Sequence, residues 1–215
     1  MTNSQVQEQA FSAVIRERRS VRSYDPSFKI SREDINALLG DAILAPSSSN
    51  LQPWRFLVID SEEQKQKLLP IAFNQQQVAD ASAVIAVLGD LESYTLAEMI
   101  YGRTVDAGFM PADTAKAYVE RMVGMYSSLS SEVKSKIVAT DGGLVSMQLM
   151  LAARARGWDT VPMGGYDAAK FKETFGVGER YLPIMLIAVG KALNPGRQTV
   201  RLAVEEVTSY NEMTN

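Results

Sequence analysis

Four arginines lie within seven positions near the start of the chain, in the stretch RERRSVRSYD. In an extended backbone, side chains two residues apart share a face, so Arg18, Ser20 and Arg22 can point toward one ligand while Arg19 and Val21 point away. Guanidinium groups make strong, directional hydrogen bonds to phosphate. The spacing therefore fits a phosphate site, although these residues taken alone favour a solvated, basic helix end.

Two further stretches have polar or open backbone where a ligand can approach. In APSSSNLQPWRF (45–56), the serine and asparagine tract is typical of a turn, but its N–H groups and hydroxyls can also line a polar ligand. In TVPMGGYD (160–167), Gly164 and Gly165 would let the backbone approach a ligand closely. Each stretch alone is a weak signal, and a plain loop or turn is the commoner interpretation.

The composition excludes several kinds of chemistry. The chain contains no cysteine and no histidine, which rules out disulfides, thiolate nucleophiles, cysteine-based metal sites and Ser-His-Asp triads. We expect no metal site, and an enzyme of this composition must take its reactivity from an organic cofactor. The balance of 22 basic and 25 acidic residues argues against a dedicated nucleic-acid binder, including an RNA-binding domain built on RERRSVR.

Length and hydropathy indicate a single cytoplasmic domain spanning residues 1–215. The longest apolar runs, VIAVLG at 84–89 and IMLIAVG at 184–190, have the length of strands and are too short to cross a bilayer. The first twenty residues lack the pattern of a signal peptide. Neither a Rossmann glycine fingerprint after a strand nor a phosphate-binding P-loop motif occurs.

Hydrophobic periodicity and turn signals predict an interleaved order of helices and strands. Helices are expected at 4–17, from Ser31 to before Pro46, at 62–72, at 141–157 with Gly157 as its cap, and at 167–175. Strands are expected at 54–60, 82–90 and 182–190, with 201–210 as a candidate further strand. Residues 91–135 are expected to form helical segments interrupted at Gly102, Gly108 and Pro111.

Several motifs together resemble one family. R-R-S-V-R-S-Y, then A-P-S-S-x-N-x-Q-P-W about 25 residues later, then V-P-M-G-G near residue 162, stand in the order of the FMN-dependent nitroreductase family. FNQQQVADAS before a buried strand, a final strand ending in Gly190 and Arg201 in the tail also match. The resemblance covers essentially the whole chain, and it changes the interpretation of the arginine cluster from a solvated helix end to a phosphate site.

The resemblance implies an α+β fold with a central, mostly antiparallel sheet flanked by helices, in an intertwined homodimer that binds two FMN molecules at its interface. One subunit would hold the flavin through Arg18, Arg19, Ser20 and Arg22, and the other through Pro46, Ser47, Ser48 and Asn50. Asn74 and Gln77 would lie at the pyrimidine edge of the ring, Gly164 and Gly165 near N5, and Arg201 over the phosphate. Within this set, Arg18 and Ser20 would face the phosphate, and Arg22 would face N1 and the C2 carbonyl.

The implied function is an FMN-dependent oxidoreductase that takes hydride from NADH or NADPH and reduces nitroaromatics, quinones or activated alkenes by a ping-pong mechanism. No side chain is expected to be catalytic in itself, although Arg22 and Gly164 would lie near the reactive ring. Alternatives are a specialised enzyme of the same fold, such as a dehalogenase or a flavin-destroying enzyme, and a non-catalytic flavin-binding protein.

The chain departs from the family pattern at three positions. Gln77 stands where some relatives have lysine, Thr199 replaces a basic residue with Arg197 as a substitute, and Gly164 replaces a frequent acidic residue. Residues 91–135 would form a variable lid or substrate segment, and 197–215 a C-terminal arm. Candidates for an apolar lid wall, with ordinary helical core as the alternative, are Met99, Phe109, Met110, Met122, Met125 and Tyr126.

Overall fold

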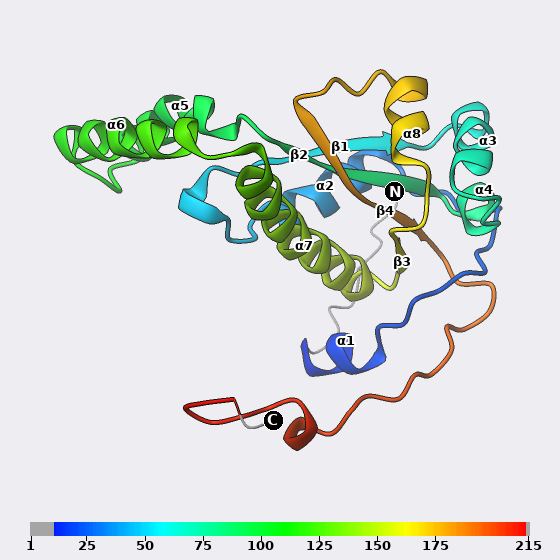
Figure 1. The fold of residues 1–215 in the computed structure, drawn as a ribbon. Helices are drawn as coiled ribbons and strands as arrows, with labels where there is room; N and C mark the ends of the chain where they lie inside the picture. Colours follow the sequence, from blue (N-terminus) through cyan, green and yellow to red (C-terminus); the bar gives the residue numbers. More distant parts are fainter. Residues whose placement is uncertain (1–10, 214–215) are drawn as a thin grey trace.

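The computed structural model describes residues 11–213, and within them a four-stranded, fully antiparallel sheet forms the centre of the fold (Figure 1). Its strands are β1 (Trp54–Ile59), β2 (Ala83–Asp90), β3 (Asp159–Met163) and β4 (Tyr181–Gly190), in the order β1-β2-β4-β3. Every residue of the central strand β2 is buried, as its unbroken apolar run predicts. The predicted α+β fold with an antiparallel sheet is confirmed.

Helices cover both faces of the sheet, and alternate residues of β4 supply the two cores. Ile187 and Val189 pack on one face with the helices α2 (Arg32–Ala42) and α7 (Ser131–Ala155). Leu186 and Ala188 pack on the other face. The helices of that second face are α3 (Glu62–Ile71), α4 (Gln77–Asp80) and α8 (Ala168–Phe175). This alternation is the period-two pattern of a strand buried on both sides.

A pair of helices extends beyond the sheet as an arm (Figure 1). After the short η2 (Ser93–Leu96), α5 (Ala97–Asp106) and α6 (Ala112–Ser128) pack with Leu51 in a small core separate from the two cores of the sheet. The candidate lid residues divide between two environments: Met122 and Tyr126 are buried in that core, Met110 packs against it, and Met99, Phe109 and Met125 are exposed. That the arm acts as a lid stays a prediction.

Most predicted elements are present with small differences at their ends. The strands expected at 54–60, 82–90 and 182–190 and the helices expected at 62–72 and 167–175 are confirmed. Ser31 caps α2 by accepting a hydrogen bond from the Asp34 N–H, and Gly157 follows α7 with a left-handed φ of 74°. The helix α1 (Phe11–Glu17) covers the described part of the helix expected at 4–17, whose first residues lie outside the described range.

Four expectations about elements were wrong. Residues 160–163, interpreted as part of a turn, belong to β3, where Pro162 is tolerated because β3 is an edge strand. The long helix begins at Ser131 rather than at 141, with Ser130 as its cap. Gly102 does not interrupt α5, and the tail at 201–210 contains only the short η3 (Val204–Glu206) instead of a strand.

None of the helices in residues 11–213 combines the length and the apolar character that a membrane crossing requires.

The buried carboxylate of Asp90 joins three parts of the sheet at one end. It accepts hydrogen bonds from Arg55 on β1 at 3.0 Å and from Arg180, just before β4, at 2.6 and 2.8 Å. Asp90→Ala would leave both guanidinium groups without this partner. We expect a loss of about 2–3 kcal/mol in the free energy of unfolding, less than for a fully buried pair because both arginines reach solvent.

Urea unfolding measures this loss, and Asp60→Ala is the matched control. Asp60 also pairs with an arginine, Arg32, at 2.9 Å, but that pair lies at the surface. The control should shift the unfolding midpoint much less than Asp90→Ala. Equal shifts would show that the buried network contributes no more than a surface ion pair.

Candidate functional site

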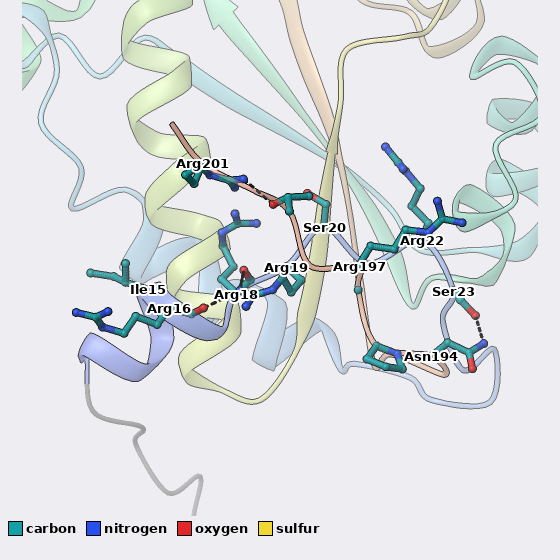
Figure 2. Close-up of a pocket in the computed structure, with 13 residues that line it drawn as sticks. Ile15, Arg16, Arg18, Arg19, Ser20, Arg22, Ser23, Asn194, Arg197 and Arg201 are labelled. Carbon is teal, nitrogen blue, oxygen red and sulfur yellow. Dashed lines mark hydrogen bonds between the residues drawn. The ribbon is translucent and has the colours of Figure 1, made fainter. Parts of the chain in front are cut away.

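An open cavity of about 870 Å³ lies between the segment after α1 and the tail that follows β4 (Figure 2). Six of its lining residues are arginines, and none of those residues, all within the described part of the chain, is acidic. The lining residues are Ile15, Arg16, Arg18, Arg19, Ser20, Arg22, Ser23, Asn194, Pro195, Gly196, Arg197, Thr199 and Arg201. The structure thus brings Arg18, Arg19, Ser20, Arg22 and Arg201 together around one cavity.

Backbone pairing with the edge strand β3 fixes the arginine segment. Ser20 forms a parallel bridge with Thr160, and the Val21 N–H donates to the Thr160 carbonyl at 3.1 Å. The Val21 side chain is 1% exposed and lies in the core, away from the cavity, as expected for an extended strand. β3 therefore holds the polar side chains of this segment at the edge of the sheet.

Arg19 departs from the expected alternation. Its Nη1 turns back along the chain and donates to the carbonyls of Arg16 at 2.6 Å and Arg18 at 2.9 Å. Arg19 therefore lines the same cavity instead of pointing away from it. The expectation failed because hydrogen bonds to nearby carbonyls redirect a side chain as long as arginine.

The tail after β4 closes the other side of the cavity. The Leu193 N–H donates to the Ser23 carbonyl, and the Asn194 amide donates to the Ser23 hydroxyl, each at 2.9 Å. Gly196 then lies so close to the arginine segment that an added Cβ would be 2.5 Å from the Arg19 Cβ. The sequence did not identify Ser23, Asn194 or Gly196 as site residues, because only the fold brings them beside the arginines.

The cavity arginines differ from most other arginines of the chain in having no carboxylate partner. Five arginines elsewhere, Arg32, Arg55, Arg154, Arg156 and Arg180, form ion pairs with Asp or Glu. Among the described residues, none of the six cavity arginines does so. The pKa of Arg18 is lowered first by burial and then by repulsion from Arg201 and Arg19. A bound anion would relieve this repulsion, so the cavity is suited to phosphate.

A second group of predicted site residues lies at the far end of β3. The amide of Gln75 donates to the Gly165 carbonyl at 2.8 Å, and the buried amide of Gln77 donates to the Gln75 side chain at 2.9 Å. An added Cβ at Gly164 or Gly165 would meet no atom within 4 Å, so packing does not require glycine at either position. Asn74, exposed with a left-handed φ of 55°, lies just before these glutamines. These contacts are compatible with an open surface beside β3.

The third predicted group, Pro46, Ser47, Ser48 and Asn50, lies apart from the arginine cavity, and none of its members lines it. Ser48, in the short η1 (Ser48–Asn50), donates from its N–H and its hydroxyl to the buried Asp141 of α7 at 3.0–3.1 Å. Burial raises the pKa of Asp141. Within one subunit this loop therefore contributes no residue to the lining of the arginine cavity.

Three residues of the η1 loop have a positive φ, in the left-handed region that residues other than glycine rarely adopt: Ser49, Asn50 and Gln52. The hydroxyl of Tyr101 on α5 donates to the Ser49 carbonyl at 3.1 Å, and Tyr126 on α6 lies 3.2 Å from the Ser49 hydroxyl. Strained backbone of this kind persists where surrounding contacts hold it, and it is common at ligand sites.

Gly196→Ala tests whether contact between the tail and the arginine segment maintains the cavity. The new Cβ would meet the Arg19 Cβ and lie 3.2 Å from the Ser20 carbonyl, so the tail must move outward and take Arg197 and Arg201 with it. We expect phosphate-bearing ligands to bind at least about tenfold more weakly, since charge-assisted hydrogen bonds are lost. Calorimetry measures the affinity, with Gly178→Ala, where an added Cβ meets no atom, as the control. Unchanged affinity would contradict a role for the tail in the cavity.

No group of acidic residues within 11–213 is arranged to hold a metal ion. The geometry instead offers an arginine cavity, an open glycine loop at the other end of the same edge strand, and a separate strained loop.

Comparison with known proteins places this arrangement in a family. The Nitroreductase family model matches residues 15–191. The chain is 46% identical over 202 residues to "Putative NAD(P)H nitroreductase YdgI" of Bacillus subtilis, covering 93% of this chain and 97% of the relative. It is 32% identical to "CLA biosynthesis enone reductase" of Lactiplantibacillus plantarum, covering 90% of each chain.

A solved structure matches the chain in both sequence and fold. The crystal structure of a "putative nitroreductase in complex with FMN" from Exiguobacterium sibiricum superimposes with a TM-score of 0.91 at 46% identity, covering 94% of this chain and 98% of that one. The motifs that resemble the family thus lie in a chain whose sequence and fold both match it. The protein belongs to the Nitroreductase family.

Proposed function

We propose that this protein is an FMN-dependent oxidoreductase that takes hydride from NADH or NADPH and passes it to a nitroaromatic, quinone or activated alkene. The observation that carries the proposal is the cavity of arginines without carboxylate partners, beside the strand that leads to Gly164 and Gly165. The FMN complex of the Exiguobacterium sibiricum relative supports it, and so does the reductase name of the Lactiplantibacillus plantarum relative.

The donor groups of the cavity fit the two ends of FMN. Arg18, Ser20 and Arg201 would bind the phosphate, because the first two lie on the extended segment and Arg201 lies close enough to lower the pKa of Arg18. When bound, the flavin supplies the hydride-transfer chemistry. Arg22 would lie at the N1–C2 carbonyl edge, where a fixed guanidinium stabilises negative charge and raises the reduction potential.

The residues at the far end of β3 would orient the ring and leave proton supply to water. Gly164 and Gly165 would allow a backbone N–H to approach N5, and Asn74 and Gln77 would lie near the pyrimidine edge. Burial raises the pKa of Tyr166 to about 12, so its hydroxyl is a weaker proton donor than that of an exposed tyrosine. With no histidine or cysteine in the chain, water would deliver the proton that accompanies hydride to the acceptor.

A second copy of the chain would complete the site. The loop from Pro46 to Asn50 does not line the arginine cavity of its own chain, so it would contact the flavin of the partner in a homodimer. Large apolar side chains exposed on the tail and on α7 support such an interface: Val200, Leu202, Val204, Val207, Tyr210, Met213, Leu144 and Met147. We propose that residues 1–215 form one domain of a cytoplasmic enzyme. Residues 91–135, which include the helical arm, would form the lid, and residues 197–215 would form a C-terminal arm that contacts the partner.

The first experiment measures bound flavin and its reduction. Purified protein should contain FMN, and anaerobic NADH or NADPH should bleach it. Arg22→Ala should mainly lower the reduction potential of the flavin and have the smaller effect on FMN affinity. Arg18→Ala should weaken FMN binding by at least about tenfold, with little change in the reduction potential. Equal effects of the two substitutions would contradict the division of roles. Bound FMN that neither donor bleaches would favour a non-catalytic or specialised protein.

Mixed dimers test whether the site is shared. Arg18→Ala would damage the arginine cavity, and Asn50→Gly would remove a side chain from the other loop while suiting its φ of 48°. Each homodimer should hold little FMN. If each flavin is bound by both chains, a dimer of one variant with the other has one intact site and one doubly damaged site. FMN content should recover to about one molecule per dimer, whereas no recovery would mean that each chain holds its flavin alone.

A further inference from the structure

The arginine cavity carries more positive charge than one flavin phosphate requires. A phosphate monoester has a charge of about −2 at neutral pH, against six guanidinium groups in the described lining. Our proposed flavin contacts use Arg18, Arg22 and Arg201, and Arg19 is bonded to the backbone of its own segment. Arg16 and Arg197, the latter offered by the sequence as a substitute for the basic residue replaced by Thr199, are not among these contacts, and a further anion would reduce the repulsion among the like charges.

Arg197 is well placed to bind that further anion. It follows Gly196, which packs on the backbone of the arginine segment, so its starting point is fixed. Its side chain is exposed, and within residues 11–213 it has no ion pair or hydrogen-bond partner. In Figure 2, Arg197 extends to the same side of the cavity as Arg22, whereas Arg16 lies at the opposite side on α1. Arg197 therefore stands on the side that we assign to the flavin ring, where the hydride donor must also bind.

We propose that Arg197 binds the 2′-phosphate of NADPH and makes NADPH the preferred donor; this inference rests on the proposed function. NADH and NADPH share their pyrophosphate and differ only at the 2′ position of the adenosine ribose. In Rossmann folds, which bind the same donors, a carboxylate bonds to the 2′-hydroxyl of NADH, whereas an arginine accommodates the 2′-phosphate of NADPH. No carboxylate is present among the cavity's described lining residues. The cavity thus has the group that accepts the phosphate and lacks the group that would repel it.

Charge complementarity between the donor and the cavity also favours NADPH. The flavin monoester, the donor pyrophosphate and the 2′-phosphate each contribute about two negative charges at neutral pH. Of these groups only the 2′-phosphate distinguishes NADPH from NADH, and a guanidinium placed beside it would stabilise its charge. The guanidinium fork of Arg197 can also form two parallel hydrogen bonds to a phosphate, which an ammonium group cannot.

The primary test uses the flavin-loaded protein and two probes that differ only in the 2′-phosphate, adenosine 2′,5′-bisphosphate and adenosine 5′-monophosphate. Calorimetry should give at least about tenfold tighter binding of the bisphosphate, because a charge-assisted pair is gained. Arg197→Gln should abolish most of this difference, and Arg197→Lys should keep only part of it. Arg16→Gln is the matched control, since it removes the same charge from the opposite side of the same cavity.

Kinetics provide the second readout. Arg197→Gln should lower kcat/KM for NADPH by about 10- to 100-fold through KM, and change that for NADH by less than about twofold. Equal losses with both donors would overturn the proposal in favour of binding to the shared pyrophosphate. Equal effects of Arg16→Gln would overturn it in favour of the general field of the cavity. Loss of FMN from Arg197→Gln would assign the residue to the flavin instead.

The two proposals fail in different ways. A wild-type protein that holds no FMN, or whose FMN neither donor reduces, contradicts the proposed function. The binding comparison does not depend on turnover, and it can be made on the protein as purified. Equal affinity for the two adenosine probes overturns the role of Arg197 even in a fully active enzyme.

Discussion

Mutual repulsion among guanidinium groups is the constraint on which the site depends. Ordinary folding would separate such charges or pair each with a carboxylate, as the chain does for Arg32, Arg154 and Arg156. Around the cavity, the backbone bridge between Ser20 and Thr160 and the burial of Val21 hold the arginines together instead. The sheet thus provides the stability that the cavity lacks until an anion binds.

The edge strand β3 joins the parts of the site within one chain. The arginine segment pairs with its beginning, and the Gly164–Gly165 loop follows its end, so one short strand sets the distance between the regions that we assign to the phosphate and to the ring. The tail after β4 completes the wall by packing on the same segment through Asn194 and Gly196.

Local signals in the sequence were enough to predict the strands β1, β2 and β4, because each is an apolar run bounded by turn residues. β3 was missed because it has five residues, includes Pro162 and leads into two glycines, all of which resemble a turn. The arginine cluster and Arg201 were identified from their motifs. Gly196 was not, because its importance comes from the approach of a segment far away in the sequence. The redirection of Arg19 was missed for a different reason, since its long side chain bonds to the carbonyls of Arg16 and Arg18, which are close to it in the sequence.

The contacts of Tyr101 and Tyr126 with Ser49 have a consequence for how proteins of this architecture can diversify. The helical arm formed by α5 and α6 does more than cover a surface, since its hydroxyls support a strained loop that we assign to the partner's flavin. An exchange of the arm for one of different sequence would therefore change two properties at once, the shape offered to an acceptor and the strength with which the neighbouring subunit retains its cofactor. A chimera that keeps both tyrosines would separate these properties, so substrate range could be altered without loss of the flavin.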